Sequence, residues 1–503
     1  MSLTSPVQLL NDAARLSPTT VAYVCGDTSL TYAEAGRIAS GLREALTDMG
    51  AKGRAVALVL PNGIPVCLYS FAAQSAGAMV CAVNPAYTAR ELGQVITDAE
   101  PAVIVCGEGT EHAVRAAAPV SARVLVVPDD TEAWLADAPR TSGSLPVPPP
   151  DTIGTLQYTG GTSGRPKGVM LTNGAVARNI VQREAMLPTV PGDERVLCVM
   201  PLFHVFAQSM CLHLTAMARG TLVILPRYKP GETLDAIERH RITRFPAGPT
   251  VFNGLIATPG FEARDWSGLR CAYSGSAPLS VATLTRWEAA TGAPIYEGYG
   301  QTEAGPILTF NGPSHPARPG TVGLPVEGTE IRLLDLVDPG CDARPGEAGE
   351  IAACGPQIMS GYKGLSEETA EALSAGGWLR TGDVGRFDEA GYLVIEDRKK
   401  DLVLVGGYNV YLREVDEVLM AYPSVAEAAV IGVPDSYRGE RLVAYVVGGD
   451  LSEAALRAHC EERLVRYKQP FEYVLTEALP RTPAQKIDKR ALRDGYEGRS
   501  DVA

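Results

Sequence analysis

The chain has 503 residues, of which 46% are apolar and 20% charged, and its mean hydropathy is +0.02. This composition excludes the disordered and fibrous classes, and the length exceeds the roughly 100–200 residues that one domain usually contains. The formal net charge of −13 argues against a nucleic-acid-binding surface, because contacts to nucleic-acid phosphates need clustered Lys and Arg.

The N-terminal segment has apolar residues at amphipathic helical spacing and lacks the basic and apolar regions of a signal peptide. The longest apolar region, residues 56–78, is interrupted by polar side chains, so no segment reaches the roughly 20 residues that span a bilayer. The 10 cysteines are scattered singly, which indicates reduced core thiols. We therefore expect a cytoplasmic protein without a transmembrane anchor.

Short apolar runs typical of β-strands alternate with helical patterns over the first half of the chain. This alternation predicts layered α/β sheets with buried parallel strands. The runs lie at residues 55–60, 79–84, 101–106, 123–128, 195–201 and 221–226. A segment rich in Pro, Ser and Gly at 134–150 is typical of a surface linker.

The pattern changes in the second half of the chain. Beyond about residue 320, short strands separated by Gly and Pro turns predict a β-rich subdomain. A last unit opens at DRKKDL (397–402) and mixes strand and helix patterns. We expect an α/β protein with a large N-terminal domain at residues 1–396, which includes the β-rich subdomain. A small, mobile α+β C-terminal domain is expected at residues 397–503.

The run YTGGTSGRPKG (158–168) has the composition of a phosphate-binding loop. Glycines let backbone N–H groups approach phosphate oxygens, hydroxyls donate hydrogen bonds, and Lys167 supplies a positive charge. The run is not a Walker A loop, because Gly168 stands where that motif requires Ser or Thr. We expect the loop between a strand at 152–158 and a helix that starts near Asn173.

A second run, YEGYGQTE (296–303), joins an aromatic ring to a glycine turn, a hydroxyl and a carboxylate. The ring of Tyr299 suits adenine, and Glu303 suits Mg²⁺, which commonly takes one or two carboxylates together with waters and phosphate oxygens. Taken alone, this run is as typical of a structural turn as of a nucleotide site. Its interpretation depends on the other motifs.

Five motifs together resemble the adenylate-forming superfamily of acyl-CoA synthetases, luciferases and nonribosomal adenylation domains. They are YTGGTSGRPKG, EGYGQTE, WLRTGD (378–383), DRKKD (397–401) and PRTPAQK (480–486). The resemblance covers nearly the whole chain, and PLFHVF (201–206) makes it most similar to fatty-acyl-CoA and aryl-CoA ligases. It implies that ATP and Mg²⁺ activate a small-molecule carboxylic acid to an acyl-adenylate, and that the acyl group then passes to coenzyme A.

The resemblance also implies the nucleotide contacts. Thr302 and Glu303 would serve the α-phosphate and Mg²⁺, while Asp383 and Arg398 would bind the ribose hydroxyls, for which a carboxylate and an arginine fork are suited. The residues expected at the β- and γ-phosphates are Thr159, Gly160, Gly161, Thr162, Ser163, Gly164 and Lys167. Those expected around adenine are Gly275, Ser276, Ala277, Glu297, Gly298, Tyr299 and Gly300.

By the same resemblance, Lys486 is the adenylation lysine, which would stabilise the negative charge that develops at the acid and the α-phosphate. The C-terminal domain is expected to rotate after adenylation about a hinge at Lys400, because a hinge needs only a residue that can absorb a backbone change. Gly406 and Gly407 would then face the path of the thiol. His204 resembles the aromatic gate between the half-reactions, the alternative being a packed loop histidine.

Four positions have residues that differ from the usual ones in these motifs: Ser163, Asn173, Val405 and Gln485. The last two lie in regions that shape the second half-reaction, so they leave open another acceptor. The alternatives are a carrier-protein thiol, an amine, or nitrite in the diazotisation of an aryl amine. A nucleotide-binding scaffold without catalysis is the third hypothesis, and the intact lysine and carboxylate positions argue against it.

The acid is expected to bind near residues 205–206, 245–250, 274–278 and 300–307, which are mostly apolar or small. This composition favours an aliphatic or aromatic acid, and none of these residues is placed to bind an ammonium group. Arg244 could pair with a second carboxylate of the substrate, the alternative being a surface residue at a strand end.

Overall fold

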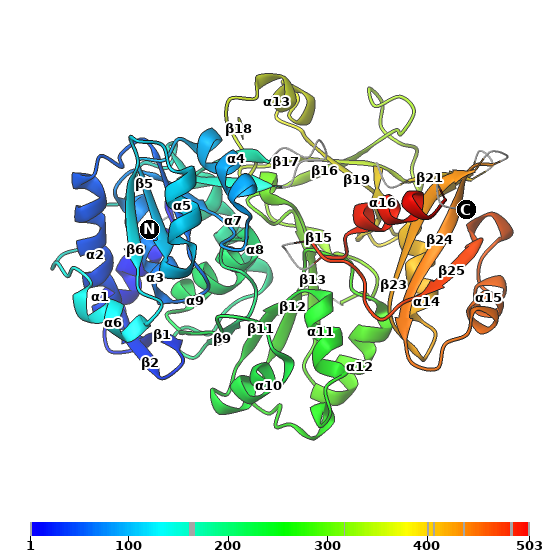
Figure 1. Cartoon of the computed structure of the whole chain (residues 1–503), viewed down its shortest axis with the longest axis horizontal. Helices are drawn as coiled ribbons and strands as arrows, with labels where there is room; N and C mark the ends of the chain where they lie inside the picture. The colour runs from blue at the N-terminus through cyan, green and yellow to red at the C-terminus, as the bar shows by residue number, and fades with distance from the viewer. Residues whose placement is uncertain are drawn as a thin grey trace.

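The computed structural model describes residues 3–159, 166–315, 317–399, 402–405, 408–435, 438–482 and 486–500. Within these ranges the chain forms a large N-terminal domain and a separate C-terminal domain, which lies at the right of Figure 1 in orange and red. The N-terminal domain contains two mixed sheets covered by helices and one antiparallel sheet. The predicted α/β class, including the β-rich subdomain, is confirmed.

The first sheet has the strand order β18-β8-β7-β4-β3-β5-β6. It is parallel from β7 to β6 and antiparallel where β8 pairs with β7 and β18. Strands β3 and β5 are buried along their whole length, because parallel strands are covered on both faces. The strands are β3 (Ala55–Val59), β4 (Met79–Ala82), β5 (Val103–Gly107), β6 (Arg123–Val127), β7 (Ile153–Thr159), β8 (Lys167–Thr172) and β18 (Gly361–Tyr362).

The second sheet has the order β15-β14-β13-β12-β11-β9-β10-β1-β2. Its strands from β13 to β1 are parallel, so the carboxyl ends of β9, β11, β12 and β13 lie at one edge, where α/β sheets bind ligands. The strands are β1 (Val21–Cys25), β2 (Thr28–Thr31), β9 (Arg195–Cys198), β10 (Thr221–Ile224), β11 (Arg244–Ala247), β12 (Cys271–Ser274), β13 (Ile295–Tyr299), β14 (Thr309–Phe310) and β15 (Leu324–Pro325).

Helix α3 (Ile64–Ser75) is buried along its whole length and contacts β1 of the second sheet as well as β3 and β4 of the first. Its sequence is accordingly apolar on all sides. The other helices of this domain are α1 (Val7–Leu16), α2 (Tyr32–Asp48), α4 (Ala89–Ala99), α5 (Glu111–Ala117), α6 (Thr131–Asp137), α7 (Asn173–Met186), α8 (Val205–Ala207), α9 (Leu214–Ala218), α10 (Pro230–Arg239), α11 (Pro249–Ile256), α12 (Val281–Thr291) and α13 (Ser366–Ala372).

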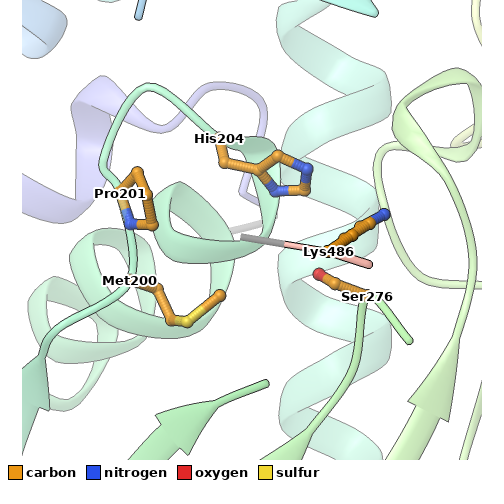
Figure 2. A pocket seen from close by; sticks show the side chains of 5 residues that line it. All are labelled: Met200, Pro201, His204, Ser276 and Lys486. Atoms are coloured by element: carbon orange, nitrogen blue, oxygen red, sulfur yellow. The ribbon is translucent and has the colours of Figure 1, made fainter. Parts of the chain in front are cut away.

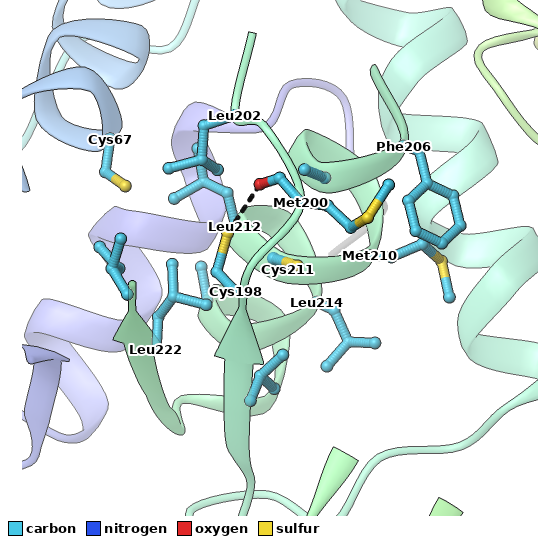
Figure 3. Close-up of a cluster of buried hydrophobic side chains, with 14 of the residues drawn as sticks. Cys67, Cys198, Met200, Leu202, Phe206, Met210, Cys211, Leu212, Leu214 and Leu222 are labelled. Atoms are coloured by element: carbon cyan, nitrogen blue, oxygen red, sulfur yellow. Dashed lines mark hydrogen bonds between the residues drawn. The ribbon is translucent and has the colours of Figure 1, made fainter. Parts of the chain in front are cut away.

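The end of β9 runs into an apolar cluster that supports the loop after this strand. Figure 3 shows Cys198, Met200 and Phe206 packed with side chains of the π-helical turn Gln208–His213, such as Cys211. The Cys198 thiol donates a hydrogen bond of 3.4 Å to the Met200 carbonyl. Dense packing of this kind fixes the loop that carries His204.

The third sheet is antiparallel, with the order β16-β17-β19-β20. Its strands are β16 (Glu330–Leu334), β17 (Gly349–Cys354), β19 (Leu379–Phe387) and β20 (Leu393–Arg398). In the C-terminal domain the order is β22-β21-β24-β23, with β25 parallel to β24. Its elements are β21 (Val403–Val405), β22 (Tyr408–Val410), α14 (Leu412–Met420), β23 (Val425–Asp435), β24 (Gly439–Gly448), α15 (Glu453–Glu461), β25 (Glu472–Leu475) and α16 (Lys489–Ser500).

The cysteines and the helices test two further expectations. All 10 cysteines are free, and most are buried, as predicted for core thiols. Cys341 is exposed, while Cys25 and Cys354 are partly exposed. Among the helices in the described ranges, none is both long and apolar enough to cross a membrane.

Candidate active site

A small pocket, with a free volume of about 10 Å³, lies where strands β9 and β12 end. Met200, Pro201 and His204 come from the loop after β9, Ser276 follows β12, and Lys486 belongs to the C-terminal domain. Figure 2 shows the Lys486 side chain extending between His204 and Ser276. The structure therefore brings together three predicted site residues that are far apart in the sequence.

Lys486 is a half-buried cation at the junction of the two domains. Burial and, to a smaller extent, the charge of Arg398 lower the pKa of its ammonium to about 8, while Asp383 opposes this shift. The Lys486 carbonyl accepts a hydrogen bond of 2.8 Å from the Thr482 amide. At neutral pH the ammonium therefore keeps its proton and places a positive charge in the pocket.

His204 is held by its own loop. Its Nδ1 accepts a hydrogen bond of 3.2 Å from the Phe206 amide, so in the neutral ring the proton lies on Nε2. Burial, together with the charge of Lys486, lowers the pKa of His204 to about 3. His204 is therefore an uncharged aromatic wall of the pocket at neutral pH.

Tyr299, Asp383 and Arg398 form one polar group beside Lys486. The Tyr299 hydroxyl donates to Asp383 Oδ2 at 2.7 Å, and Arg398 Nε lies 3.5 Å from Asp383 Oδ1. Asp383 and Arg398 face each other across the β19–β20 pair, which fixes their spacing. Residues predicted to bind adenine and ribose thus lie in direct contact.

Glu303 lies in the 3₁₀ turn Thr302–Ala304 after β13, and both Thr302 and Glu303 are buried. The Tyr362 hydroxyl donates a hydrogen bond of 2.9 Å to Glu303 Oε1, and Lys167 Nζ lies 5.0 Å from the centre of the Tyr362 ring. Burial raises the pKa of the Glu303 carboxyl. Tyr362 therefore links the predicted metal ligand to the predicted phosphate lysine.

Sequence reasoning missed Tyr362. It lies in the short run GYKG (361–364), and its position is set by the pairing of β18 with β8. The only local signal was a tyrosine between two glycines, which is common in turns.

Glu297 is 5% exposed, and burial raises the pKa of its carboxyl to about 7. The charge of Arg413, in α14 of the C-terminal domain, and a hydrogen bond from the Leu279 amide both oppose this shift. The pKa of Glu297 therefore depends on a residue of the C-terminal domain as well as on burial in its own domain.

Four predicted residues near adenine have backbone or packing roles. A Cβ on Gly298 would lie 2.4 Å from the Phe310 ring, and one on Gly300 would lie 2.0 Å from the Pro306 carbonyl oxygen. Ser276 has a φ of 70°, in the left-handed region. Gly275 and Ala277 flank Ser276 in the turn after β12, and a Cβ on Gly275 would lie 2.8 Å from the Phe206 ring.

The surroundings of the glycine-rich loop differ from the prediction in one respect. Thr159 and Lys167 are paired residues of the β7–β8 hairpin, and α7 begins at Asn173 only after strand β8. The loop thus joins two antiparallel strands, and β8 was missed because its run KGVMLT is short and weakly patterned. The predicted residues Gly160, Gly161, Thr162, Ser163, Gly164, Lys400, Gly406 and Gly407, and the variant position Gln485, lie outside the described residues.

Three other positions have structural roles. Arg244 is 5% exposed and forms an ion pair of 2.9 Å with Glu194, so it is neither a surface residue nor a lining residue of the pocket. Val405 is 3% exposed and packs in the core of the C-terminal domain. Asn173 donates a hydrogen bond of 3.0 Å to the Thr152 hydroxyl.

Comparisons with known proteins identify the family of the chain. A family model described as AMP-binding enzyme matches residues 10–363, and one described as AMP-binding enzyme C-terminal domain matches residues 414–486. The long-chain-fatty-acid–CoA ligase of Bacillus subtilis (strain 168) is 35% identical over 479 residues, which cover 88% of this chain and 85% of that protein. Feruloyl-CoA synthase of an Amycolatopsis species is 37% identical over 486 residues, covering 95% of this chain and 96% of that protein.

Among solved structures, the anthranilate CoA ligase AuaEII in complex with anthranoyl-AMP matches with a TM-score of 0.91 at 26% identity, covering 98% of each chain.

Proposed function

The chain belongs to the AMP-binding enzyme family and is an ATP-dependent, AMP-forming acid–CoA ligase. On this premise we propose that its substrate is a carboxylic acid whose carboxylate is its only charged group and whose remaining part is mostly apolar. The observation that carries the proposal is the position of the Lys486 ammonium in a pocket whose walls are Met200, Pro201 and neutral His204. Relatives named for a fatty acid and for ferulate support an aliphatic or aryl acid.

In the first half-reaction the acid's carboxylate attacks the α-phosphorus of ATP, the bond to the bridging oxygen breaks, and pyrophosphate leaves. Little proton transfer is needed, so the protein acts by positioning and by electrostatic stabilisation. Lys486 would stabilise the negative charge that develops between the carboxylate and the α-phosphate. A positioned donor of this kind contributes about 10²–10³ in rate.

The nucleotide would bind along the groups that surround Lys486. Tyr299 offers its ring to adenine, with Glu297 and the turn of Ser276 at its edge, and Asp383 and Arg398 take the ribose. Thr159, Lys167 and the loop between them would hold the β- and γ-phosphates. The network joining Tyr299, Asp383 and Arg398 supports this order, because one hydrogen-bonded group then serves base and sugar together.

The residues present also fit Mg²⁺. Glu303 is a buried carboxylate held by Tyr362, and Mg²⁺ in nucleotide sites takes one or two carboxylates together with phosphate oxygens and waters. Within the described ranges no cluster of three or more His, Cys, Asp or Glu could hold a metal, which suits an ion that arrives with the nucleotide. Bound there, Mg²⁺ would neutralise charge on the phosphates. Thr302 would then assist at the α-phosphate.

For the second half-reaction we place the division between a core at residues 1–396 and a lid at residues 397–503, with the hinge at Lys400. Rotation of the lid would withdraw Lys486 and bring Gly406 and Gly407 to the thiol path, past the ring of His204. We place the reaction in the cytoplasm, where ATP and CoA are available and free thiols such as those of this chain stay reduced.

The test is to incubate purified protein with MgATP and a panel of octanoate, palmitate, benzoate, ferulate and anthranilate, with and without CoA, and to measure AMP and product mass. We expect AMP and a thioester mass with at least one acid of the panel. Adenylate without a thioester in the presence of CoA would contradict the acceptor, and carrier protein, amines and nitrite would then be added. Val405 gives no support to those alternatives, because it is buried in the C-terminal core.

A further inference from the structure

One arginine of the C-terminal domain bridges to the N-terminal domain beside the active-site lysine. Arg481 Nη1 donates a hydrogen bond of 2.9 Å to the hydroxyl of Thr250, which lies in the first turn of α11. Arg481 Nη2 pairs with Glu427 of β23 in its own domain. The Arg481 and Glu427 side chains are only 22% and 20% exposed, so water screens this bridge less than it screens a surface ion pair.

The backbone couples Arg481 to Lys486. Arg481 and Ile487 form an isolated antiparallel β-bridge, which closes the loop that ends at Lys486. Within this loop the Thr482 amide donates to the Lys486 carbonyl at 2.8 Å, and the Thr482 hydroxyl accepts from the Lys486 amide at 3.2 Å. Because these contacts join Arg481 and Thr482 to Ile487 and Lys486, a displacement of Arg481 from Thr250 should also displace Lys486 from the pocket.

The position of Lys486 in the pocket indicates in which half-reaction the contact between Thr250 and Arg481 is present. Lys486 lines this small pocket, and by the proposed function the reacting carboxyl group must come to lie beside its ammonium. A thiol that attacks the same carbonyl carbon needs its own approach, and a Lys486 side chain in contact with the carboxyl group would occupy part of the space around that carbon. The contact between Thr250 and Arg481 therefore belongs to the arrangement that forms the adenylate.

We propose that Arg481 and Thr250 form a positioning pair, which holds Lys486 in the pocket while the acyl-adenylate forms and separates before the thioester forms. This inference rests on the proposed function of Lys486. The pair acts through Lys486 and touches no reacting atom. Its removal slows the first half-reaction and leaves the second intact.

Thr250→Val removes the hydroxyl and keeps the shape of the side chain, Thr250→Ser keeps the hydroxyl, and Arg481→Ala removes the bridge. Arg463→Ala is the matched control, because this exposed lid arginine contacts Glu462 and His459 of its own domain. The first half-reaction is measured as exchange of labelled pyrophosphate into ATP, with octanoate and with ferulate. The second is measured as thioester formation from synthetic octanoyl- and feruloyl-adenylate with CoA.

We expect pyrophosphate exchange to fall about tenfold in Thr250→Val and Arg481→Ala, as for the loss of a hydrogen bond to a charged group, with the KM for ATP changed less than about twofold. Thioester formation should stay within about twofold of wild type, Arg463→Ala should behave as wild type, and Thr250→Ser should keep more exchange activity than Thr250→Val. The double variant should lose no more than the worse single variant. Equal losses in both half-reactions, or no loss in exchange, would overturn the proposal.

A measurement without substrate separates this inference from the proposed function. If the wild type adenylates neither acid, the proposed function fails on those acids, and trypsin cleavage after Arg398 and Lys399 of the free protein decides the positioning pair. Loss of the bridge should raise this cleavage about fivefold in Thr250→Val and Arg481→Ala, because the lid opens more often, and leave Arg463→Ala unchanged. Equal cleavage in all variants would refute the pair.

Discussion

Raising the pH through 8 should remove the charge of Lys486 and with it the adenylation activity. The Lys486 ammonium has its pKa lowered from 10.5 to about 8, first by burial and then by Arg398. A group with a pKa of 8 is about nine-tenths protonated at pH 7 and about one-tenth at pH 9. For the free enzyme, kcat/KM should therefore be level below about pH 7 and fall about tenfold for each pH unit above 8.

The assay is pyrophosphate exchange between pH 6 and 10 at constant free Mg²⁺, which avoids the titration of the CoA thiol. Lys486→Arg keeps a positive charge that does not titrate in this range, so its alkaline decline should disappear even if its rate is lower. Lys486→Ala should lose about 10²–10³ in rate and show no alkaline decline. ATP binding, measured by calorimetry, should be retained in both variants.

Two results would refute this reasoning. An alkaline decline that persists in Lys486→Arg would assign the titration to another group, and a midpoint near pH 10.5 in the wild type would mean that burial does not perturb the lysine. His204 adds a further check, because burial and Lys486 lower its pKa to about 3. It should therefore produce no acid limb above about pH 5.

Three other substitutions test the surroundings of the site. Tyr362→Phe removes the hydrogen bond of 2.9 Å to Glu303, so the Mg²⁺ concentration for half-maximal exchange should rise about threefold to tenfold, and an unchanged value would contradict the link. Burial raises the pKa of Glu297 from 4.5 to about 7, so the folded protein holds this proton more tightly than the unfolded chain. The free energy of unfolding therefore falls as the pH rises from 4.5 through 7. Glu297→Gln should therefore raise Tm by about 3 °C at pH 8 and by much less at pH 5, in differential scanning calorimetry, and equal shifts would argue against titration of this group. Gly275→Ala places a Cβ 2.8 Å from the Phe206 ring, which should lower the free energy of unfolding by about 1–3 kcal/mol. It should also raise the KM for the acid more than the KM for ATP. A change confined to the KM for ATP would show that Phe206 does not line the acid site.

The sequence was sufficient for the fold class, and it named candidate site residues because the motifs carry them at fixed local spacing. Tyr299, Glu303 and Asp383 were named from short runs, and the structure joins Tyr299 to Asp383, whose charge acts on Lys486. Motifs of this kind specify backbone turns and side-chain chemistry together, so each can be identified without knowledge of the tertiary structure.

The features that the sequence did not reveal depend on contacts between distant segments. Tyr362 reaches Glu303 because β18 pairs with β8. Arg244 can be buried because Glu194, the Tyr273 hydroxyl and the Pro188 carbonyl lie beside it. Strand β8 was overlooked because a hairpin after a glycine-rich run has little periodicity of its own. The contact between Thr250 and Arg481 joins two domains, so no local pattern could indicate it.

The position of β1 in the second sheet has a consequence for synthesis on the ribosome. Val24 of β1 pairs with Val223 of β10, so the partners lie about 200 residues apart, and at about 5–20 residues per second the second emerges some 10–40 s after the first. Until then the hairpin of β1 and β2 lacks the parallel neighbour β10, and apolar side chains such as Tyr23 stay exposed to solvent. Fragments that end before β10 should therefore aggregate or bind chaperones, and the earliest part of the chain to be made is among the last to fold.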